Sequence, residues 1–449
     1  MEVMEAALAR IADVNPALNA LVSLRDPDIL MTEARRADAE LGRGTLRGWM
    51  HGFPHAVKDL ANVKGLVTTM GSPVFKDTVA QADDIFVERI RAAGAIFIGK
   101  TNTPEFGLGS NTYNPVFGVT RNVLDPTRTA GGSSGGAAVA LAAGMVPVAD
   151  GSDMMGSLRN PAAWNGVIGF RPSMGRIPDG NAVDLFAGSL ATIGPMGRTV
   201  ADTAQLFATM AGYDSRAPLS TAGDPAVFAP PLGRDMVGLR IGWLGDLDGY
   251  LAMEEGVLAL CETALGTLRD LGCTVSEARL DFPPEALWET WLTLRKVIVA
   301  ELLAPLYTNE STRASMKPEA VWEVENGLRV TAAEIAKARA GRSAWYRALR
   351  GLFGRFDLLV LPSAQVFPFD ADIHWPKEIV GRTMDTYHRW MEVVIPGTLG
   401  GGPVINVPAG VNADGLAMGM QLMGPMNADR LVLDSAYAYG QARIGRELC

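Results

Sequence analysis

Short apolar stretches that suit β-strands alternate along this chain with longer stretches in which apolar residues recur at helical spacing. The expected strands are residues 55–57, 95–98, 146–149, 239–243, 358–361 and 404–407. The expected helices are residues 84–93, 135–143, 200–211, 254–271, 331–353 and 429–442, and residues 1–16 also show an amphipathic helical pattern. Alternation of this kind predicts an α/β fold built around a largely parallel or mixed sheet. No period in the sequence indicates a solenoid or a propeller.

The chain has 449 residues and no convincing linker, because Gly and Pro are spread throughout and no low-complexity tract interrupts them. We therefore expect a single large domain over residues 1–449. The stretch from about residue 214 to residue 350 differs from the rest, since it is rich in Leu, Ala and Trp and poor in motifs. Its tryptophans, such as Trp288, Trp291 and Trp322, are expected to serve mainly in packing.

The overall charge narrows the classes of function. A formal net charge of −9 argues against a nucleic-acid-binding protein, which needs basic side chains to neutralise phosphates.

Three cysteines, Cys261, Cys273 and Cys449, do not suggest a disulfide framework in a chain of this length. Of the four histidines, His51 and His55 are close in sequence, but no cluster of ligand-type residues accompanies them. We therefore expect no metal and no organic cofactor.

Nothing in the sequence predicts a membrane or secretory segment. The acidic amphipathic start lacks the basic region that opens a signal peptide. The most apolar stretch, residues 137–149, is too short to span a bilayer and contains Gly144 and Pro147. The expectation is a soluble, cytoplasmic protein with no membrane partner.

The candidate chemistry lies in two serines and a lysine. Ser133 stands in the run GGSSGG, Ser157 stands in DMMGSLRNP, and Lys58 stands in the apolar phrase HGFPHAVKDL. A hydroxyl nucleophile needs a base to take its proton, and glycines let backbone N–H groups approach a developing oxyanion. These three residues supply the parts of an acyl-transfer site without a histidine.

Each candidate also has an ordinary interpretation. Lys58 alone would be an exposed lysine, but its apolar neighbours in HGFPHAVKDL favour burial, which lowers the pKa of an amine and makes it available as a base. The GGSSGG loop opens a predicted helix, and Gly131 and Gly132 permit unusual backbone angles there. The GGSSGG loop also resembles a phosphate-binding loop, although it lacks the GK[ST] ending of that motif. Ser157 is well placed to N-cap a helix that begins at Leu158.

Together the motifs resemble those of the amidase signature family of serine hydrolases. AVKDL, GKTNTPEFGLG, NPVFGVTRN, GGSSGG, GSLRNPAAWNGVIGFRP and GPVINVPAG…GLAMGMQL occur in the family's order over nearly the whole chain. The resemblance implies the amidase signature fold, in which a central mixed β-sheet is flanked by α-helices on both sides. It also implies that the segment around residues 214–350 packs beside the core and shapes the substrate pocket.

By this resemblance the chain carries a Ser–cisSer–Lys triad. Ser157 would be the nucleophile, Ser133 the bridging serine on a cis peptide bond, and Lys58 the base. The backbone amides of residues 154–157 would form the oxyanion hole, namely those of Met154, Met155, Gly156 and Ser157. Three further residues would support the site: Ser134 within the hydrogen-bond network, and Asp153 and Arg159 by fixing the loop around the nucleophile.

Two features depart from the family's pattern. Many members have two glycines before the nucleophile, whereas this chain has Met155 and then Gly156. A positive φ at Met155 would add strain, and otherwise the methionine side chains would line the pocket. The chain also begins within what is usually the second helical segment of the family.

The expected function is hydrolysis of a small-molecule carboxylic amide to a carboxylate and ammonia or an amine through an acyl-enzyme. The Met and Trp content favours an aryl or aliphatic amide, and reactive esters are expected as side substrates. A second hypothesis is a glutaminase-type amidase subunit of an amidotransferase complex. A third is a binding protein that kept the fold without the activity. A homodimer would be unsurprising for the family.

Overall fold

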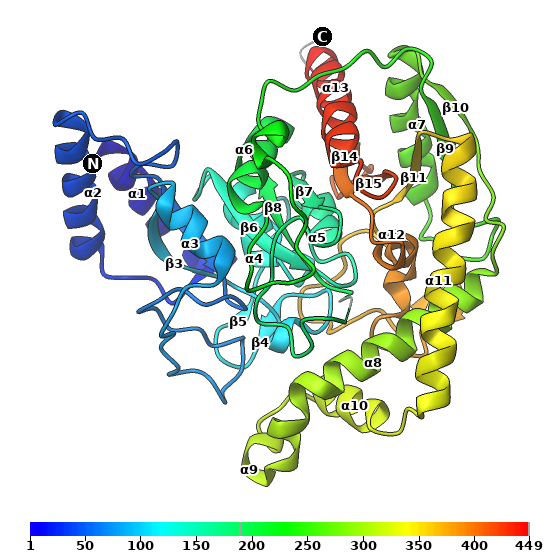
Figure 1. Ribbon diagram of the computed structural model, residues 1–449, viewed down its shortest axis with the longest axis horizontal. Coiled ribbons are helices and arrows are strands. Elements are labelled where there is room, and N and C mark those ends of the chain that lie inside the picture. The colour runs from blue at the N-terminus through cyan, green and yellow to red at the C-terminus, as the bar shows by residue number, and fades with distance from the viewer. Residues whose placement is uncertain (188–189, 448–449) are drawn as a thin grey trace.

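The computed structural model describes residues 1–187 and 190–447 (Figure 1). Its largest feature is an eight-stranded sheet with the strand order β10-β9-β11-β15-β14-β7-β8-β6. The strands of this sheet are β6 (Val148–Asp153), β7 (Ile168–Arg171), β8 (Thr192–Gly197), β9 (Arg240–Trp243), β10 (Thr274–Glu277), β11 (Leu358–Pro362), β14 (Val404–Val411) and β15 (Ala417–Met423). The β10/β9 and β9/β11 pairs are parallel and the remaining pairs are antiparallel, so the sheet is mixed.

A second sheet has three strands in the order β1-β3-β2. They are β1 (Leu21–Val22), β2 (Pro54–Lys58) and β3 (Ile96–Thr101). β2 pairs parallel with β3, and every residue of both strands is buried. β2 also packs against β6, the edge strand of the large sheet, so the carboxyl end of β2 lies beside it. Two short hairpins complete the strands: β4 (Tyr113–Asn114) with β5 (Gly118–Val119), and β12 (Glu378–Ile379) with β13 (Arg382–Thr383).

Helices flank the large sheet, as the resemblance implies. The helices are α1 (Glu2–Leu18), α2 (Pro27–Gly42), α3 (Ile85–Ala92), α4 (Gly135–Ala142), α5 (Arg159–Trp164), α6 (Val200–Met210), α7 (Val257–Asp270), α8 (Pro284–Thr308), α9 (Glu310–Arg313), α10 (Pro318–Gly327), α11 (Ala332–Arg355), α12 (Ile395–Gly400) and α13 (Asp429–Glu447). α5 packs on β7, β14 and β15, whereas α7 and α13 also contact β14. α4 packs on β6 and on the small sheet, and so connects the two sheets.

The segment from about residue 214 to residue 350 contains more than helices. Strands β9 and β10 lie within it and form one edge of the large sheet, while α10 and α11 each pack against α8. In Figure 1 the long α11 runs down the right of the view from beside β9, and α8 lies across the bottom of the view with α9 and α10. Trp288 and Trp291 are buried with their rings 5.5 Å apart, so packing is their role, as predicted.

The predicted strands and helices are all present, with ends shifted by a few residues. Four strands of the large sheet (β7, β8, β10 and β15) and the helices α2, α8, α9, α10 and α12 were not predicted. Within the described ranges no helix is both long and apolar enough to cross a membrane. Cys261 and Cys273 are buried free thiols, and Cys449 lies outside the described residues.

Close packing at the start of α4 yields a stability prediction. A Cβ on Gly136 would lie 2.6 Å from the carbonyl oxygen of Ala20 and against the backbone of Asn102, whereas a Cβ on Gly351 in α11 would meet nothing within 4 Å. We expect Gly136→Ala to lower the free energy of unfolding by ~1–3 kcal/mol or more, because backbone atoms cannot move aside easily. Gly351→Ala should raise it by up to ~1 kcal/mol, because alanine is the better helix former. Urea unfolding followed by circular dichroism measures both, and equal stability of the two variants would contradict this packing.

Candidate active site

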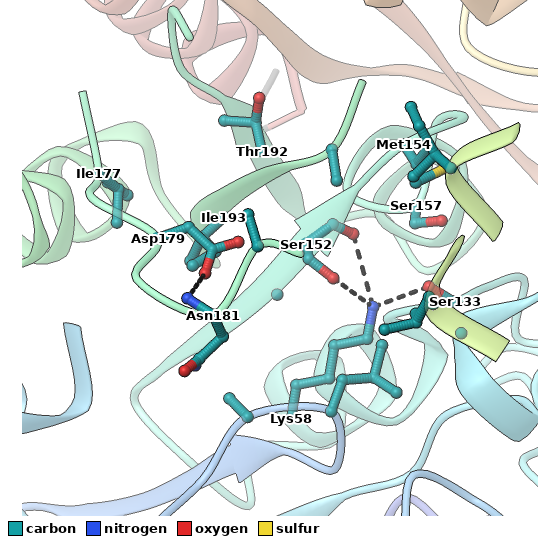
Figure 2. A pocket seen from close by; sticks show the side chains of 18 of the residues that line it. Lys58, Ser133, Ser152, Met154, Ser157, Ile177, Asp179, Asn181, Thr192 and Ile193 are labelled. Carbon is teal, nitrogen blue, oxygen red and sulfur yellow. Dashed lines mark hydrogen bonds between the residues drawn. The ribbon is translucent and has the colours of Figure 1, made fainter. Parts of the chain in front are cut away.

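Lys58 is the last residue of β2, and its side chain is buried between the two sheets with 2% exposure. Its Nζ lies 2.8 Å from Ser133 Oγ, 2.9 Å from Ser134 Oγ and 3.2 Å from Ser152 Oγ (Figure 2). The interpretation of Lys58 as an exposed lysine is therefore wrong. The three hydroxyls surround the amine, and Ser134 belongs to the network as predicted.

Burial governs the charge state of Lys58. It lowers the pKa of the amine to about 7, although the carboxylates of Asp150 and Asp153 oppose the shift. The carboxylate of Asp150 bonds to groups other than the amine: it accepts the backbone N–H of Lys58 at 3.1 Å and lies 3.0 Å from His55 Nε2. A substantial fraction of Lys58 is therefore neutral near pH 7 and can accept a proton.

Ser133 lies in the loop that opens α4. The peptide bond between Gly132 and Ser133 is cis, as the resemblance implies, and Gly131 has a φ of 77°. Gly132 has no positive φ but precedes the cis peptide bond, and its need for a small residue is steric. A Cβ there would lie 3.0 Å from Thr112 Oγ1. The loop thus holds the Ser133 hydroxyl against Lys58 through close packing.

Ser157 follows β6 in the turn that leads to α5. That helix begins at Arg159 with Leu158 as its N-cap, so the prediction that Ser157 caps a helix is wrong. Asp153 instead holds the turn before the helix, because its Oδ2 accepts the N–H of Leu158 at 3.2 Å; among the described residues no side chain caps α5. Among the described residues the Ser157 hydroxyl has no hydrogen-bond partner, and the side chain lines the cavity next to Lys58 and Ser133 (Figure 2).

One of the four amides predicted to form the oxyanion hole is already hydrogen-bonded within the turn 154–157. The N–H of Gly156 donates to Asp153 Oδ1 at 2.8 Å, which removes it from the set of free donors. Gly156 has a φ of 79°, whereas Met155 has no positive φ, so the methionine adds no strain of that kind. The side chains of Met154 and Met155 line the cavity instead. An oxyanion hole at the amides of Met154, Met155 and Ser157 stays a prediction.

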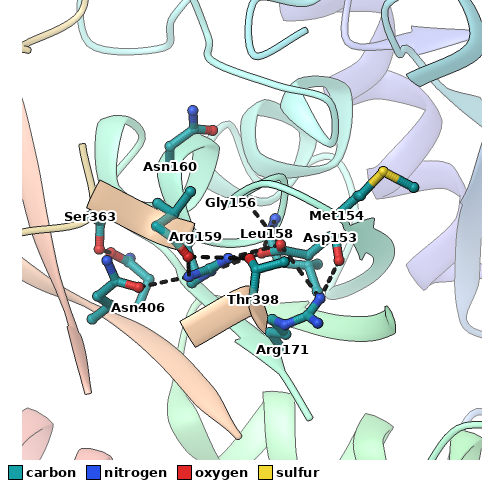
Figure 3. Close-up of polar contacts among 12 residues, drawn as sticks. Asp153, Met154, Gly156, Leu158, Arg159, Asn160, Arg171, Ser363, Thr398 and Asn406 are labelled. Carbon is teal, nitrogen blue, oxygen red and sulfur yellow. Dashed lines mark hydrogen bonds and ion pairs between the residues drawn. The ribbon is translucent and has the colours of Figure 1, made fainter. Parts of the chain in front are cut away.

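Asp153 and Arg159 form a fully buried, bidentate ion pair beneath this turn (Figure 3). Arg159 Nε and Nη2 each lie 2.9 Å from a carboxylate oxygen of Asp153, and its remaining N–H groups reach Thr398 Oγ1 and Gln421 Oε1. Arg171 donates to the backbone carbonyl of Asp153. Although burial raises the pKa of Asp153, Arg159 lowers it to about 2, so the carboxylate stays charged. Both residues contact the loop around Ser157, and their role in fixing its conformation stays a prediction.

Lys58, Ser133 and Ser157 all line one cavity of about 340 Å³. Its walls are mostly apolar and include Phe86, Phe106, Ile177, Ile193, Ile298 and Leu302. In the described part of the chain, no group of three or more His, Cys, Asp or Glu residues is placed to hold a metal ion. The arrangement offers a hydroxyl nucleophile, a second hydroxyl and a buried amine at the end of an apolar cavity.

Comparison with known proteins agrees with this geometry. The family model described as Amidase matches residues 2–433. The chain belongs to the amidase signature family.

Several members of the family are similar to this chain over nearly its whole length. An acylamidase of Rhodococcus erythropolis is 33% identical, over 98% of this chain and 92% of the relative. A glutamyl-tRNA(Gln) amidotransferase subunit of Symbiobacterium thermophilum is 35% identical with the same coverage. Among solved structures, a bacterial aryl acylamidase superposes with a TM-score of 0.89 at 28% identity, covering 98% of this chain and 92% of that one. The chain is thus an amide-hydrolysing enzyme of this family.

Sequence reasoning missed three residues that line this cavity. Asp150 and Ser152 alternate along β6, and this spacing could have placed both on the face toward Lys58. Arg295 lines the cavity from α8, far along the chain from the motifs around Lys58, Ser133 and Ser157, and no local pattern indicates it. It comes from the motif-poor segment that the resemblance expects to shape the pocket.

The ion pair below the turn 154–157 yields a second stability prediction. Asp153→Asn leaves two buried guanidinium groups without their counter-ion, and we expect it to cost ~3–5 kcal/mol of unfolding free energy. The matched control is Asp281→Asn, whose partner Arg355 lies at 3.2 Å in an exposed pair, with an expected cost below ~1 kcal/mol. Urea unfolding measures both variants. A similar small cost for the two would show that the buried pair does not stabilise the loop.

Proposed function

We propose that this amidase hydrolyses a small-molecule carboxylic amide to a carboxylate and ammonia or an amine, with Ser157 as nucleophile, Ser133 as relay and Lys58 as base. The observation that carries the proposal is the 2.8 Å contact between Lys58 Nζ and Ser133 Oγ in a cavity that Ser157 also lines. The relatives named acylamidase and aryl acylamidase support the same reaction class.

In the proposed first half-reaction, neutral Lys58 takes a proton from Ser133 while Ser133 takes the proton of Ser157. Ser157 Oγ forms a bond to the amide carbon, and the carbonyl oxygen becomes an oxyanion held by free amides of the turn 154–157. The C–N bond then breaks, and the relay returns its proton to the leaving nitrogen. Water attacks the acyl-enzyme by the same route and releases the carboxylate and Ser157.

The hydroxyls around Lys58 support its role as a base. A neutral amine has two N–H donors and one lone pair. Ser134 Oγ at 2.9 Å and Ser152 Oγ at 3.2 Å accept the two N–H groups in our proposal, which directs the lone pair to Ser133. The nearest groups are thus dipoles rather than carboxylates, and they orient the amine without stabilising its protonated form strongly.

The pH dependence of the reaction tests the base. Because the neutral form of Lys58 is required, we expect kcat/KM to rise ~tenfold per pH unit on the acid side and to level off above the lysine pKa of about 7. The measurement is kcat/KM for one amide across this range, with intrinsic fluorescence as a control for folding. A flat profile, or a rate that falls as the pH increases toward 7, would contradict this assignment.

Substitution of the proposed base and nucleophile tests the triad. We expect Lys58→Met and Ser157→Ala each to lower kcat by ~10³-fold or more. Lys58→Met should unfold at or above the wild-type temperature, because it removes a buried amine without leaving a cavity. Ser220→Ala, at a cavity serine whose hydroxyl bonds to the backbone of Asp214, is the matched control and should retain near wild-type turnover. Substantial activity in either triad variant would overturn the mechanism.

A second candidate function follows from the similarity to glutamyl-tRNA(Gln) amidotransferase subunits, one of them 35% identical. In that case the same triad would release ammonia from glutamine for a partner protein. Turnover of simple amides by the purified chain supports the first function. Glutamine hydrolysis that requires a co-purified protein, without turnover of simple amides, supports the second.

A further inference from the structure

Arg295 is a second buried cation in the wall of the cavity. It extends from α8, is 4% exposed, and lines the same cavity as Ser157. Its Nε donates to Glu323 Oε1 at 2.6 Å, and its Nη2 donates to the hydroxyl of Tyr387 at 2.9 Å. For Nη1, the partner within the described residues is the sulfur of Met154 at 3.2 Å.

This set of partners leaves the Nη1 donors of the guanidinium without a strong hydrogen-bond acceptor. An arginine side chain carries five N–H donors, and a thioether sulfur is a weak acceptor. A buried donor without a good acceptor is costly, and a ligand that supplies an oxygen removes the cost. The Nη1 end of Arg295 is therefore a ready donor for an oxygen atom in the cavity, beside the loop that carries Ser157.

The charge around Arg295 indicates what kind of oxygen fits. Although burial raises the pKa of Glu323, Arg295 lowers it to about 2, so the two form a charged pair with no net charge. Burial lowers the pKa of neighbouring His388 to about 4, which keeps the imidazole neutral. Burial also raises the pKa of Tyr387 well above its ordinary value, which keeps the phenol neutral. A carboxylate beside Arg295 would add an unbalanced negative charge.

The rest of the cavity disfavours an anionic ligand as well. Among the described lining residues, the other charged side chains apart from Lys58 are acidic: Asp84, Asp150, Asp179 and Asp184. On α8 itself, Arg295 is followed by Ile298, Val299 and Leu302, which continue the wall as an apolar surface. A molecule that matches these surfaces has an apolar body and a neutral oxygen acceptor.

We propose that Arg295 is a specificity-determining residue that donates hydrogen bonds to a second, neutral carbonyl oxygen of the substrate, so that the preferred substrates are apolar amides bearing such a carbonyl. This inference rests on the proposed amidase function and deepens it by naming the substrate class. Arg295 takes no part in proton transfer.

A purely structural role for Arg295 makes a different prediction. α8 also reaches the nucleophile loop through Trp291, whose Nε1 lies 3.5 Å from the carbonyl oxygen of Met154. If Arg295 only held that loop, its removal would slow all amides to the same degree. The test must therefore compare substrates with and without the second oxygen.

The experiment uses two matched pairs of amides. In the first, a keto-alkanamide is compared with the branched alkanamide in which a methyl group replaces the keto oxygen, so that the acyl side differs. In the second, the same exchange is made on the amine side of an N-alkylacetamide. We expect the wild type to favour the keto compound in one pair by ~10–100-fold in kcat/KM.

The variant removes both charges of the pair together, because Arg295→Met alone would leave Glu323 buried without a partner. In the double variant Arg295→Met/Glu323→Gln we expect the preference for the keto compound to fall to about one. Lys296→Met, which removes the next cation of α8 outside the cavity lining, is the matched control and should keep the preference. An unchanged preference in the double variant, or the absence of a preference in the wild type for both pairs, would overturn the proposal.

Binding to the Ser157→Ala protein separates this inference from the proposed function. Titration calorimetry of the keto and branched amides needs no turnover, and we expect the same ~10-fold or greater preference in Kd. If the wild type hydrolyses none of the amides while the Ser157→Ala protein binds the keto compound better, the proposed function fails and the role of Arg295 stands. Equal binding of the two compounds contradicts the role of Arg295 whatever the turnover.

Discussion

The site depends on one physical constraint, the burial of the Lys58 amine at the junction of the two sheets. An amine in that position gives up hydration, and no carboxylate of the described residues lies within hydrogen-bond distance of Nζ to compensate it. The backbone around it must therefore be held firmly. β2 and β3 are entirely buried, and α4 packs so closely on the small sheet that Gly136 has no room for a Cβ. The sheets and α4 thus enforce the charge state on which the proposed chemistry relies.

The turn 154–157, which carries the proposed nucleophile, is held by residues from the C-terminal half of the chain. Arg159 links Asp153 to the backbone carbonyl of Val394, to Thr398 on α12 and to Gln421 on β15. These partners lie in the C-terminal part of the sequence, so the C-terminal segments help to hold the loop in place. Because Asp153 also accepts the amides of Gly156 and Leu158, one carboxylate sets the conformation of the whole turn. Stability of the core and geometry of the site are therefore coupled through the same ion pair.

The sequence predicted the parts of this architecture that depend on local pattern and on motifs. The strands that lead to Lys58 and to Ser157, and the helix after GGSSGG, are all present. β8 escaped prediction because Thr192–Gly197 contains Pro195 between two glycines, a composition that is typical of turns. Arg171 ends β7 as a buried charge, which no local rule expects without its distant partner. The interpretation of Ser157 as an N-cap failed because Leu158, and not Ser157, precedes the first helical residue, Arg159.

The two buried cations of the cavity show how partners decide what a charged group can do. Lys58 meets hydroxyls at distances from 2.8 Å to 3.2 Å, and burial lowers its pKa to about 7, so it can exchange protons. Arg295 meets the carboxylate of Glu323 at 2.6 Å and stays charged, so it can only donate hydrogen bonds. The first arrangement suits a base, and the second suits recognition of an oxygen that does not react. Burial is common to both residues, but a guanidinium keeps its proton in a protein whereas a buried amine can lose it, and the carboxylate of Glu323 widens that difference.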